Sequence, residues 1–146
     1  ALYGGRGADS LRGGAGDDVI VGGKGGDTVN GGQGADTFAY HSAGDAPAGA
    51  GPGARETIVD FHPGFGDLID LSRIDAGAAE GDQAFRFIGT RGFTGSEDDP
   101  AERGEVGYDD VRGGILVRAD ADGDGIADLE IFVAGVSTIG AAEFVL

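Results

Sequence analysis

Four consecutive nonapeptides near the start of the chain share one pattern, and this repeat constrains the fold more than any other feature. Their sequences are GGRGADSLR, GGAGDDVIV, GGKGGDTVN and GGQGADTFA, which together span residues 4–39. Each follows G-G-x-G-x-D-x-U-x, where U is a large apolar residue. Both marked positions recur every nine residues without a slip, at Asp9, Asp18, Asp27 and Asp36 and at Leu11, Ile20, Val29 and Phe38. A flexible linker would keep neither in phase, although 32 of the 146 residues are glycine.

A period of nine suits six residues of turn followed by three residues of strand. Alternation along the strand directs the central apolar residue inward and its two neighbours outward. Leu2 occupies the same apolar position one period before Leu11. A single nonapeptide buries almost no surface, so the repeats have to stack into an array, and the pattern predicts a parallel β-roll.

The turn half of the repeat is suited to calcium. Glycine adopts positive φ without a steric cost, which lets backbone carbonyls point to one side of the turn. Calcium takes six to eight oxygen ligands, and the repeat is the calcium-binding pattern of RTX proteins. The expected ligands are the carboxylates of Asp9, Asp18, Asp27 and Asp36, with backbone carbonyls of Gly4, Arg6, Gly7, Gly13, Ala15, Gly16, Gly22, Lys24, Gly25, Gly31, Gln33 and Gly34. The side chains at the third position of each repeat are expected to face solvent.

One turn of the repeat supplies only half of a calcium shell, so a second turn has to supply the rest. Two nonapeptides make one coil of the roll, which places repeat n+2 directly beside repeat n. The predicted pairs are therefore Asp9 with Asp27 and Asp18 with Asp36. Without metal, these pairs would hold carboxylates against one another, so folding and calcium binding are expected to be coupled.

Composition narrows the class of partner. The formal net charge is −16, from 26 acidic and 10 basic residues. Such a charge disfavours nucleic acid and anionic membranes and suits neutralisation by divalent cations. The chain has no cysteine, hence no disulfide framework, and no apolar run long enough to span a bilayer. It begins within a repeat, and we therefore expect it to be the C-terminal piece of a longer protein.

The rest of the chain reads as β structure after a small Pro/Gly-rich loop at residues 43–55. Turn signals separate the expected strands, which are Thr57–Phe61, Leu68–Leu71, Ala84–Ile88, Gly114–Arg118, Leu129–Val133 and Phe144–Leu146. Only Ser72–Gly81 suggests a short helix or helical turn. The expected organisation is a repeat roll over residues 1–42, the loop, and a C-terminal β lobe over residues 56–146, in an all-β chain.

The segments after the repeats resemble the C-terminal domain of serralysin-type metalloproteases. The resemblance is carried by ETIVDFHPGFGDLIDLSRIDA (residues 56–76), GDQAFRFIG (81–89), DADGDGIADLEIFVAG (120–135) and the ending AAEFVL. It implies a calcium-loaded β-roll packed on a β-sandwich. It also implies a C-terminal signal read by a type I ABC secretion apparatus, a secreted extracellular protein of a Gram-negative bacterium, and an upstream catalytic domain. The stretch Glu97–Arg112 matches less well and is expected to be a variable loop.

Three further groups are candidates for metal binding. Gly64-Phe65-Gly66-Asp67 resembles a degenerate fifth turn with Ile69 in the apolar role, so Asp67, with Asp60 near it, is a candidate calcium ligand; the alternative is a solvated β-turn. Asp120, Asp122 and Asp124 open a D-x-D-x-D-G loop without the glutamate that ends an EF-hand, and a calcium-binding hairpin and a plain turn both stay open. His41 and His62 are isolated and the HExxH zinc signature is absent, so we expect no zinc site.

These observations favour a monomeric, non-catalytic calcium-binding module that folds on calcium binding and directs type I secretion of a larger protein, with a metallopeptidase as the expected upstream domain. The alternative is a carbohydrate-binding or surface-adhesive accessory module of another RTX protein. The absence of tryptophan and the scarcity of basic residues weigh against that alternative.

Overall fold

A computed structural model describes residues 1–51, 53–76, 84–94 and 104–146. Its strands are β1 (Leu2–Arg6), β2 (Ser10–Ala15), β3 (Val19–Lys24), β4 (Thr28–Gln33), β5 (Thr37–Ala39), β6 (Glu56–Ile58), β7 (Leu68–Asp70), β8 (Arg86–Gly89), β9 (Glu105–Val111), β10 (Gly114–Asp120), β11 (Leu129–Ala134) and β12 (Phe144–Val145). Short 3₁₀ turns η1 (Ala43–Asp45), η2 (Pro63–Phe65) and η3 (Ala141–Glu143) complete the elements. The described residues contain no α-helix, which confirms the all-β class, and no helix in them is long and apolar enough to cross a membrane.

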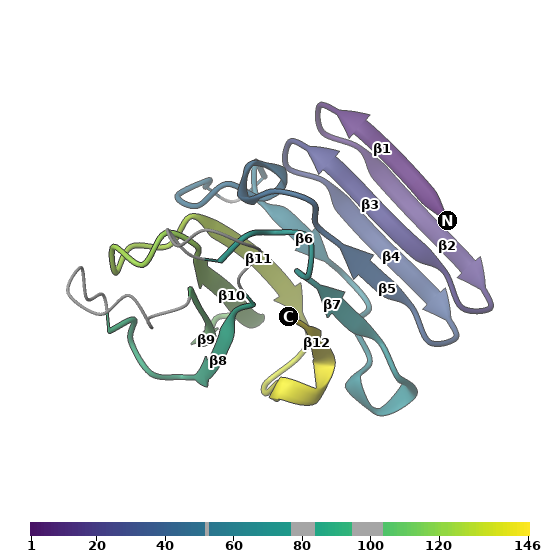
Figure 1. Ribbon diagram of the computed structural model, residues 1–146. Coiled ribbons are helices and arrows are strands. Elements are labelled where there is room, and N and C mark those ends of the chain that lie inside the picture. The colour runs from purple at the N-terminus through teal and green to yellow at the C-terminus, as the bar shows by residue number, and fades with distance from the viewer. Residues whose placement is uncertain (52, 77–83, 95–103) are drawn as a thin grey trace.

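The repeats form a parallel β-roll, in which odd and even strands alternate between two sheets (Figure 1). Leu2 pairs with Ile20 in one sheet and Leu11 pairs with Val29 in the other, so two nonapeptides make one coil, as predicted. The division of each repeat differs from the prediction. Strands β1 to β4 run for five or six residues and the bends between them for only three, because the G-G-x half continues the ladder: Gly14 pairs with Gly32.

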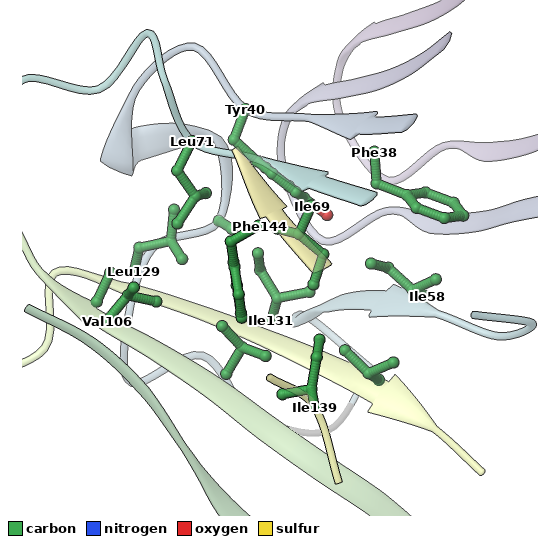
Figure 2. Packing of buried hydrophobic residues seen from close by; sticks show 14 of the residues in the cluster. Phe38, Tyr40, Ile58, Ile69, Leu71, Val106, Leu129, Ile131, Ile139 and Phe144 are labelled. Atoms are coloured by element: carbon green, nitrogen blue, oxygen red, sulfur yellow. The ribbon is translucent and has the colours of Figure 1, made fainter. Parts of the chain in front are cut away.

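The apolar position of each repeat points into the roll. Ile20, Val29 and Phe38 are each 1% exposed, whereas Leu2 and Leu11, in the first coil, are only partly buried. Figure 2 shows how this core continues into the C-terminal half, where Ile58 and Ile69 pack beside Phe38. The repeats therefore acquire a closed core through the strands that follow them.

The C-terminal strands extend both sheets of the roll (Figure 1). In one sheet β12 pairs with β7, and in the other β11 pairs with β6, both in parallel. Antiparallel β10 and β9 then follow β11, and β8 forms the edge. The roll and the C-terminal strands thus share sheets and core, and the domain boundaries expected above stay a prediction.

Five of the six expected C-terminal strands agree with the observed ones to within two residues at each end. The sixth prediction was wrong at its end, because the strand expected over Thr57–Phe61 is β6, which stops at Ile58. The prediction of a loop over Glu97–Arg112 was wrong for Glu105–Val111, which is strand β9; residues 97–103 lie outside the described part. The acidic, glycine-containing sequence of β9 hides its strand character, which pairing with β10 supplies. Of the short helix or helical turn expected over Ser72–Gly81, the described residues form a turn, with the Ile74 amide donating to the Leu71 carbonyl, and residues 77–81 lie outside the described part.

Candidate metal centre

Two ladders of carboxylates run along the roll, one at each end of its strands. In the first, Asp27 accepts a hydrogen bond from the amide of Asp9 at 2.8 Å. In the second, Asp36 accepts one from the amide of Asp18 at 2.9 Å. The predicted pairing of each repeat with the next but one is confirmed. Each aspartate thus fastens a turn of one coil to the same turn of the coil beside it.

Each ladder continues beyond the repeats. The amide of Asp27 donates to Glu56 at 3.0 Å, and the amide of Asp36 donates to Asp67 at 2.9 Å. Asp67 therefore takes the place of a fifth repeat aspartate, and Ile69 pairs with Phe38 in the expected apolar position. Glu56 was not predicted. It stands two residues before the buried Ile58, the spacing of the repeat aspartates, which was the available signal.

The second carboxylate oxygen of several rungs is buried without a partner. Oδ2 of Asp9, Asp27 and Asp36 is shielded from solvent and accepts no hydrogen bond. These oxygens face the first glycine of their own repeat: a Cβ added at Gly4 would lie 2.9 Å from Asp9 Oδ2, and one at Gly22 would lie 2.5 Å from Asp27 Oδ2. Orphaned carboxylate oxygens are costly when buried. Their convergence on a side-chain-free space fits a bound cation.

The electrostatics of the ladders also fit a bound cation. Burial, followed by repulsion from Asp9, raises the pKa of Asp27. Burial, followed by repulsion from Asp67 and Asp18, raises the pKa of Asp36. Burial and the nearby Asp27 carboxylate raise the pKa of Glu56 to about 8. A bound calcium ion supplies positive charge to oxygen ligands and so favours the ionised forms of these groups.

Some of the backbone carbonyls predicted as ligands accept a hydrogen bond from the adjacent coil. The amide of Gly7 donates to the Lys24 carbonyl at 2.8 Å, and the amide of Gly16 donates to the Gln33 carbonyl at 2.7 Å. A carbonyl has a second lone pair, so both oxygens can also meet a cation. The side chains of Arg6, Ala15, Lys24 and Gln33 are exposed, as predicted. The ligand role of the carbonyls stays a prediction.

Close approach of the backbones explains one further glycine of the repeat. Gly25 has φ of 142°, and a Cβ there would collide with the carbonyl of Gly7 in the preceding coil. Only glycine meets both demands. The G-G-x-G spacing therefore sets how closely successive turns stack, and with it the spacing of the carboxylates.

Asp60 lies beside the second ladder but differs from its rungs. Its two oxygens accept hydrogen bonds from the amides of Gly31 and Gly32, at 2.9 and 2.8 Å. Asp67 is likewise engaged at both oxygens, by the amides of Asp36 and of His62 at 2.8 Å. Both carboxylates hold backbone turns in place, and their predicted role as calcium ligands stays a prediction. The His62 ring is half exposed and its Nδ1 is 4.0 Å from Asp67.

The D-x-D-x-D-G loop brings Asp120, Asp122 and Asp124 together, with one carboxylate oxygen of each within 4.8 Å of the others. Both oxygens of the buried Asp120 accept backbone hydrogen bonds, from Gly123 at 2.7 Å and Gly125 at 2.8 Å. Burial raises the pKa of Asp120, and Asp122 and Asp124 repel its charge. The loop connects strands β10 and β11, so it is not an EF-hand, and its hydrogen bonds are those of an Asp/Gly-rich turn.

The family model of the RTX calcium-binding nonapeptide repeat matches residues 3–38, in four copies. This segment is an RTX repeat array. RTX repeats bind calcium, and they are typical of secreted extracellular proteins. The array is non-catalytic in itself. The aspartates Asp9, Asp18, Asp27 and Asp36 of the two ladders all lie within this matched segment, and their individual roles as calcium ligands stay a prediction.

The whole chain also has a known structural counterpart. It resembles the solution structure of the AlgE6R3 subunit of the Azotobacter vinelandii mannuronan C5-epimerase, with a TM-score of 0.55 and 23% identity. The match covers 97% of this chain and 80% of that chain, so the shared β-roll fold includes the C-terminal strands. No curated protein sequence matches the chain significantly.

Proposed function

We propose that this chain is a calcium-dependent folding module that keeps an exported protein unfolded inside the cell and folds it outside. The proposal depends on the buried Oδ2 atoms of Asp9 and Asp27 in the first ladder and of Asp36 in the second. These atoms have no hydrogen-bond partner among the described residues. Without a cation these carboxylates oppose folding, since a buried polar atom without a partner is destabilising. The same groups hold the coils together once their charge is balanced.

The charge of the chain supports the same proposal. A net charge of −16 on 146 residues favours expanded states through self-repulsion. Sites of extracellular modules bind calcium at about 10⁻⁴–10⁻³ M, well above the free calcium inside a cell. A chain with these properties stays unfolded before export and suits passage through a narrow channel.

Secretion by a type I ABC apparatus, reading the C-terminus, is part of this proposal. It is supported by the resemblance of residues 56–76, 81–89, 120–135 and 141–146 to the C-terminal domain of serralysin-type metalloproteases. The same resemblance supports a covalently attached metallopeptidase as the catalytic partner, and a monomeric module in the extracellular space of a Gram-negative bacterium. In a secretion assay, a reporter fused before residue 1 should leave cells that carry a type I apparatus, and removal of residues 141–146 should retain it.

Calcium titration tests the folding part directly. Calcium is added to chelated protein while the far-UV circular dichroism is recorded. We expect a cooperative gain of β signal in the micromolar to millimolar range, with magnesium as the control cation. A complete β fold already present in chelator would overturn the proposal.

A second candidate function is an accessory module that binds an acidic polysaccharide. A pocket of about 380 Å³ lies along the edge strand β8 and is lined by Arg86, Arg91, Thr94 and Glu105, among others. Guanidinium groups bind carboxylates in a bidentate fashion. The fold shared with a module of a mannuronan C5-epimerase makes a uronate polymer the first ligand to test.

Binding of mannuronan oligosaccharides to the calcium-loaded chain tests the second candidate. Perturbed amide resonances confined to β8 and residues 91–94, lost in Arg91→Gln, would support it. Arg12→Gln, an exposed arginine on strand β2, is the control. Absence of binding by the unchanged chain would remove this candidate and leave the first untouched.

A further inference from the structure

Two buried carboxylates, Asp27 of the third repeat and Glu56 beyond the matched repeats, converge on one point. A Cβ added at Gly22 would lie 2.5 Å from Asp27 Oδ2 and 3.0 Å from Glu56 Oε1. Asp27 and Glu56 are each 1% exposed, and Asp27 Oδ2 accepts no hydrogen bond. Among the described residues, no lysine or arginine forms an ion pair with either group. Two buried carboxylates aimed at the same space repel each other when both are ionised, and a cation between them would stabilise both.

Glu56 occupies the rung that a repeat aspartate would fill. Strand β6 continues the sheet next to β4, with Thr57 paired to Thr28 and Ile58 to Val29. The residue before each pair is Glu56 and Asp27, respectively, and the Asp27 amide donates to Glu56 Oε2 at 3.0 Å. The backbone of Ala54 packs against Gly26, where it would collide with an added Cβ. The turn that leads into Glu56 thus lies against the third repeat as one repeat turn lies against another.

The last carboxylates of the two ladders, Glu56 in the first and Asp67 in the second, differ in their hydrogen bonds. Asp67 uses both oxygens to accept backbone amides. Glu56 uses Oε2 in the same way, but among the described residues its Oε1 accepts a hydrogen bond only from the Tyr40 hydroxyl, at 3.3 Å, and it faces Asp27. Tyr40 is 3% exposed, and its hydroxyl donates to Glu56 from within the core. Glu56 therefore has an oxygen available for a cation, and Tyr40 sets its direction.

We propose that Asp27 and Glu56 together bind a calcium ion at the last coil of the roll, between the third matched repeat and strand β6, and that Tyr40 positions Glu56 for this role. The inference rests on the proposed calcium-dependent function and adds a site to it. This site joins the third repeat to β6 across the loop 43–55, so it ties the repeat array to the C-terminal strands. The ion therefore contributes to the closure of the roll rather than to its elongation.

Ion counting with matched variants tests the site. Glu56→Gln keeps an oxygen for the Asp27 amide and removes the charge; Glu130→Gln is the control, because Glu130 also accepts one backbone amide, from Gly49 at 2.9 Å. In isothermal titration, we expect Glu56→Gln to bind one calcium ion fewer than the unchanged chain, or to bind that ion more weakly. Loss of a residue that only supports a metal ligand weakens metal binding roughly 10–100-fold, so loss of a ligand itself should weaken it at least as much. Glu130→Gln should bind as the unchanged chain does.

Terbium emission gives a readout that does not depend on Glu56→Gln being folded. The chain has three tyrosines and no tryptophan, and Tyr40 is the one that contacts this site. Terbium bound there should emit on tyrosine excitation, and Tyr40→Phe should lose most of this emission while still binding the ion. Tyr3→Phe, on an exposed side chain, is the control.

The outcomes separate this site from the proposed function. An unchanged ion count and affinity in folded Glu56→Gln, or unchanged sensitised emission in Tyr40→Phe, would overturn the site while calcium-dependent folding stands. Failure of the unchanged chain to bind any calcium would overturn both.

Discussion

Replacement of Asp36 by asparagine should weaken the fold in a way that depends on calcium. Asp36 is fully buried, its Oδ1 accepts the Asp18 amide at 2.9 Å, and its Oδ2 has no partner. Asparagine has nearly the same shape and keeps an acceptor for the Asp18 amide. The substitution therefore removes one negative charge and one oxygen ligand, with little change in packing.

The magnitude follows from linkage. Weakening a charge-assisted hydrogen bond to a neutral one costs about 1 kcal/mol at any calcium concentration. Loss of one bound ion lowers the slope of the free energy of unfolding against the logarithm of free calcium. The difference between the two chains should grow by about 1.4 kcal/mol for each tenfold rise in calcium above the dissociation constant of the lost site.

Urea unfolding at a series of buffered calcium concentrations measures this difference. Asp17→Asn is the matched control, because Asp17 lies in an adjacent turn of the repeats, is exposed, and accepts the Ala35 amide at 2.8 Å. Its free energy of unfolding should stay parallel to that of the unchanged chain. If the Asp36→Asn line were also parallel, Asp36 would not be a calcium ligand and the reasoning from its orphaned oxygen would be refuted.

Three further predictions concern pH, packing and backbone geometry. The pKa of Glu56 is raised to about 8 in the calcium-free fold, so this group stabilises that fold below its unfolded pKa near 4.5 and loses this effect as the pH rises through 8. Calcium binding should therefore release protons, and calcium affinity should increase between about pH 5.5 and 8. A calcium midpoint of folding that does not change with pH would contradict this prediction. The Phe38 side chain is 1% exposed, so Phe38→Ala should lower the free energy of unfolding by about 3–5 kcal/mol, measured by urea titration in saturating calcium. The control Phe65→Ala, at an exposed side chain, should lower it by less than about 0.5 kcal/mol. Gly25→Ala should raise the calcium midpoint of folding, because φ is 142° there and a Cβ meets the Gly7 carbonyl, whereas Gly51→Ala, in open space, should leave the midpoint in place.

The repeat pattern predicted the central part of the candidate site because the pattern itself carries the register. Residues 18 apart are equivalent, so the pairing of Asp9 with Asp27 follows from counting once one coil is known to contain two nonapeptides. The same counting places Phe38 beside Ile20 in the core. The pattern did not show that the G-G-x half continues each strand, since glycine is disfavoured in strands and is tolerated here because neighbouring backbones approach closely.

The roles of Glu56 and of strand β9 could not be predicted in the same way. Asp27 and Glu56 are 29 residues apart, and Asp36 and Asp67 are 31 apart, so neither pair obeys the period of 18. Because a loop follows Ala39, residues beyond it cannot be aligned with the repeats by counting. The alignment of Glu56 with Asp27 is set by the pairing of β6 with β4. Strand β9 lacks a clear apolar alternation and depends on β10 for its hydrogen bonds.

The sequence by itself determined the β-roll, the phase of its carboxylates and the need for a cation, because a short repeat places equivalent atoms at regular intervals along the roll. Only the tertiary structure decided how the roll is closed. Pairing between β6 and β4 and between β6 and β11 merges the repeats with the C-terminal strands in one sheet. It also brings Glu56 and Tyr40 to the last rung beside Asp27. These contacts join segments with no common period, so they arise from burial and hydrogen bonding between distant strands rather than from any local pattern.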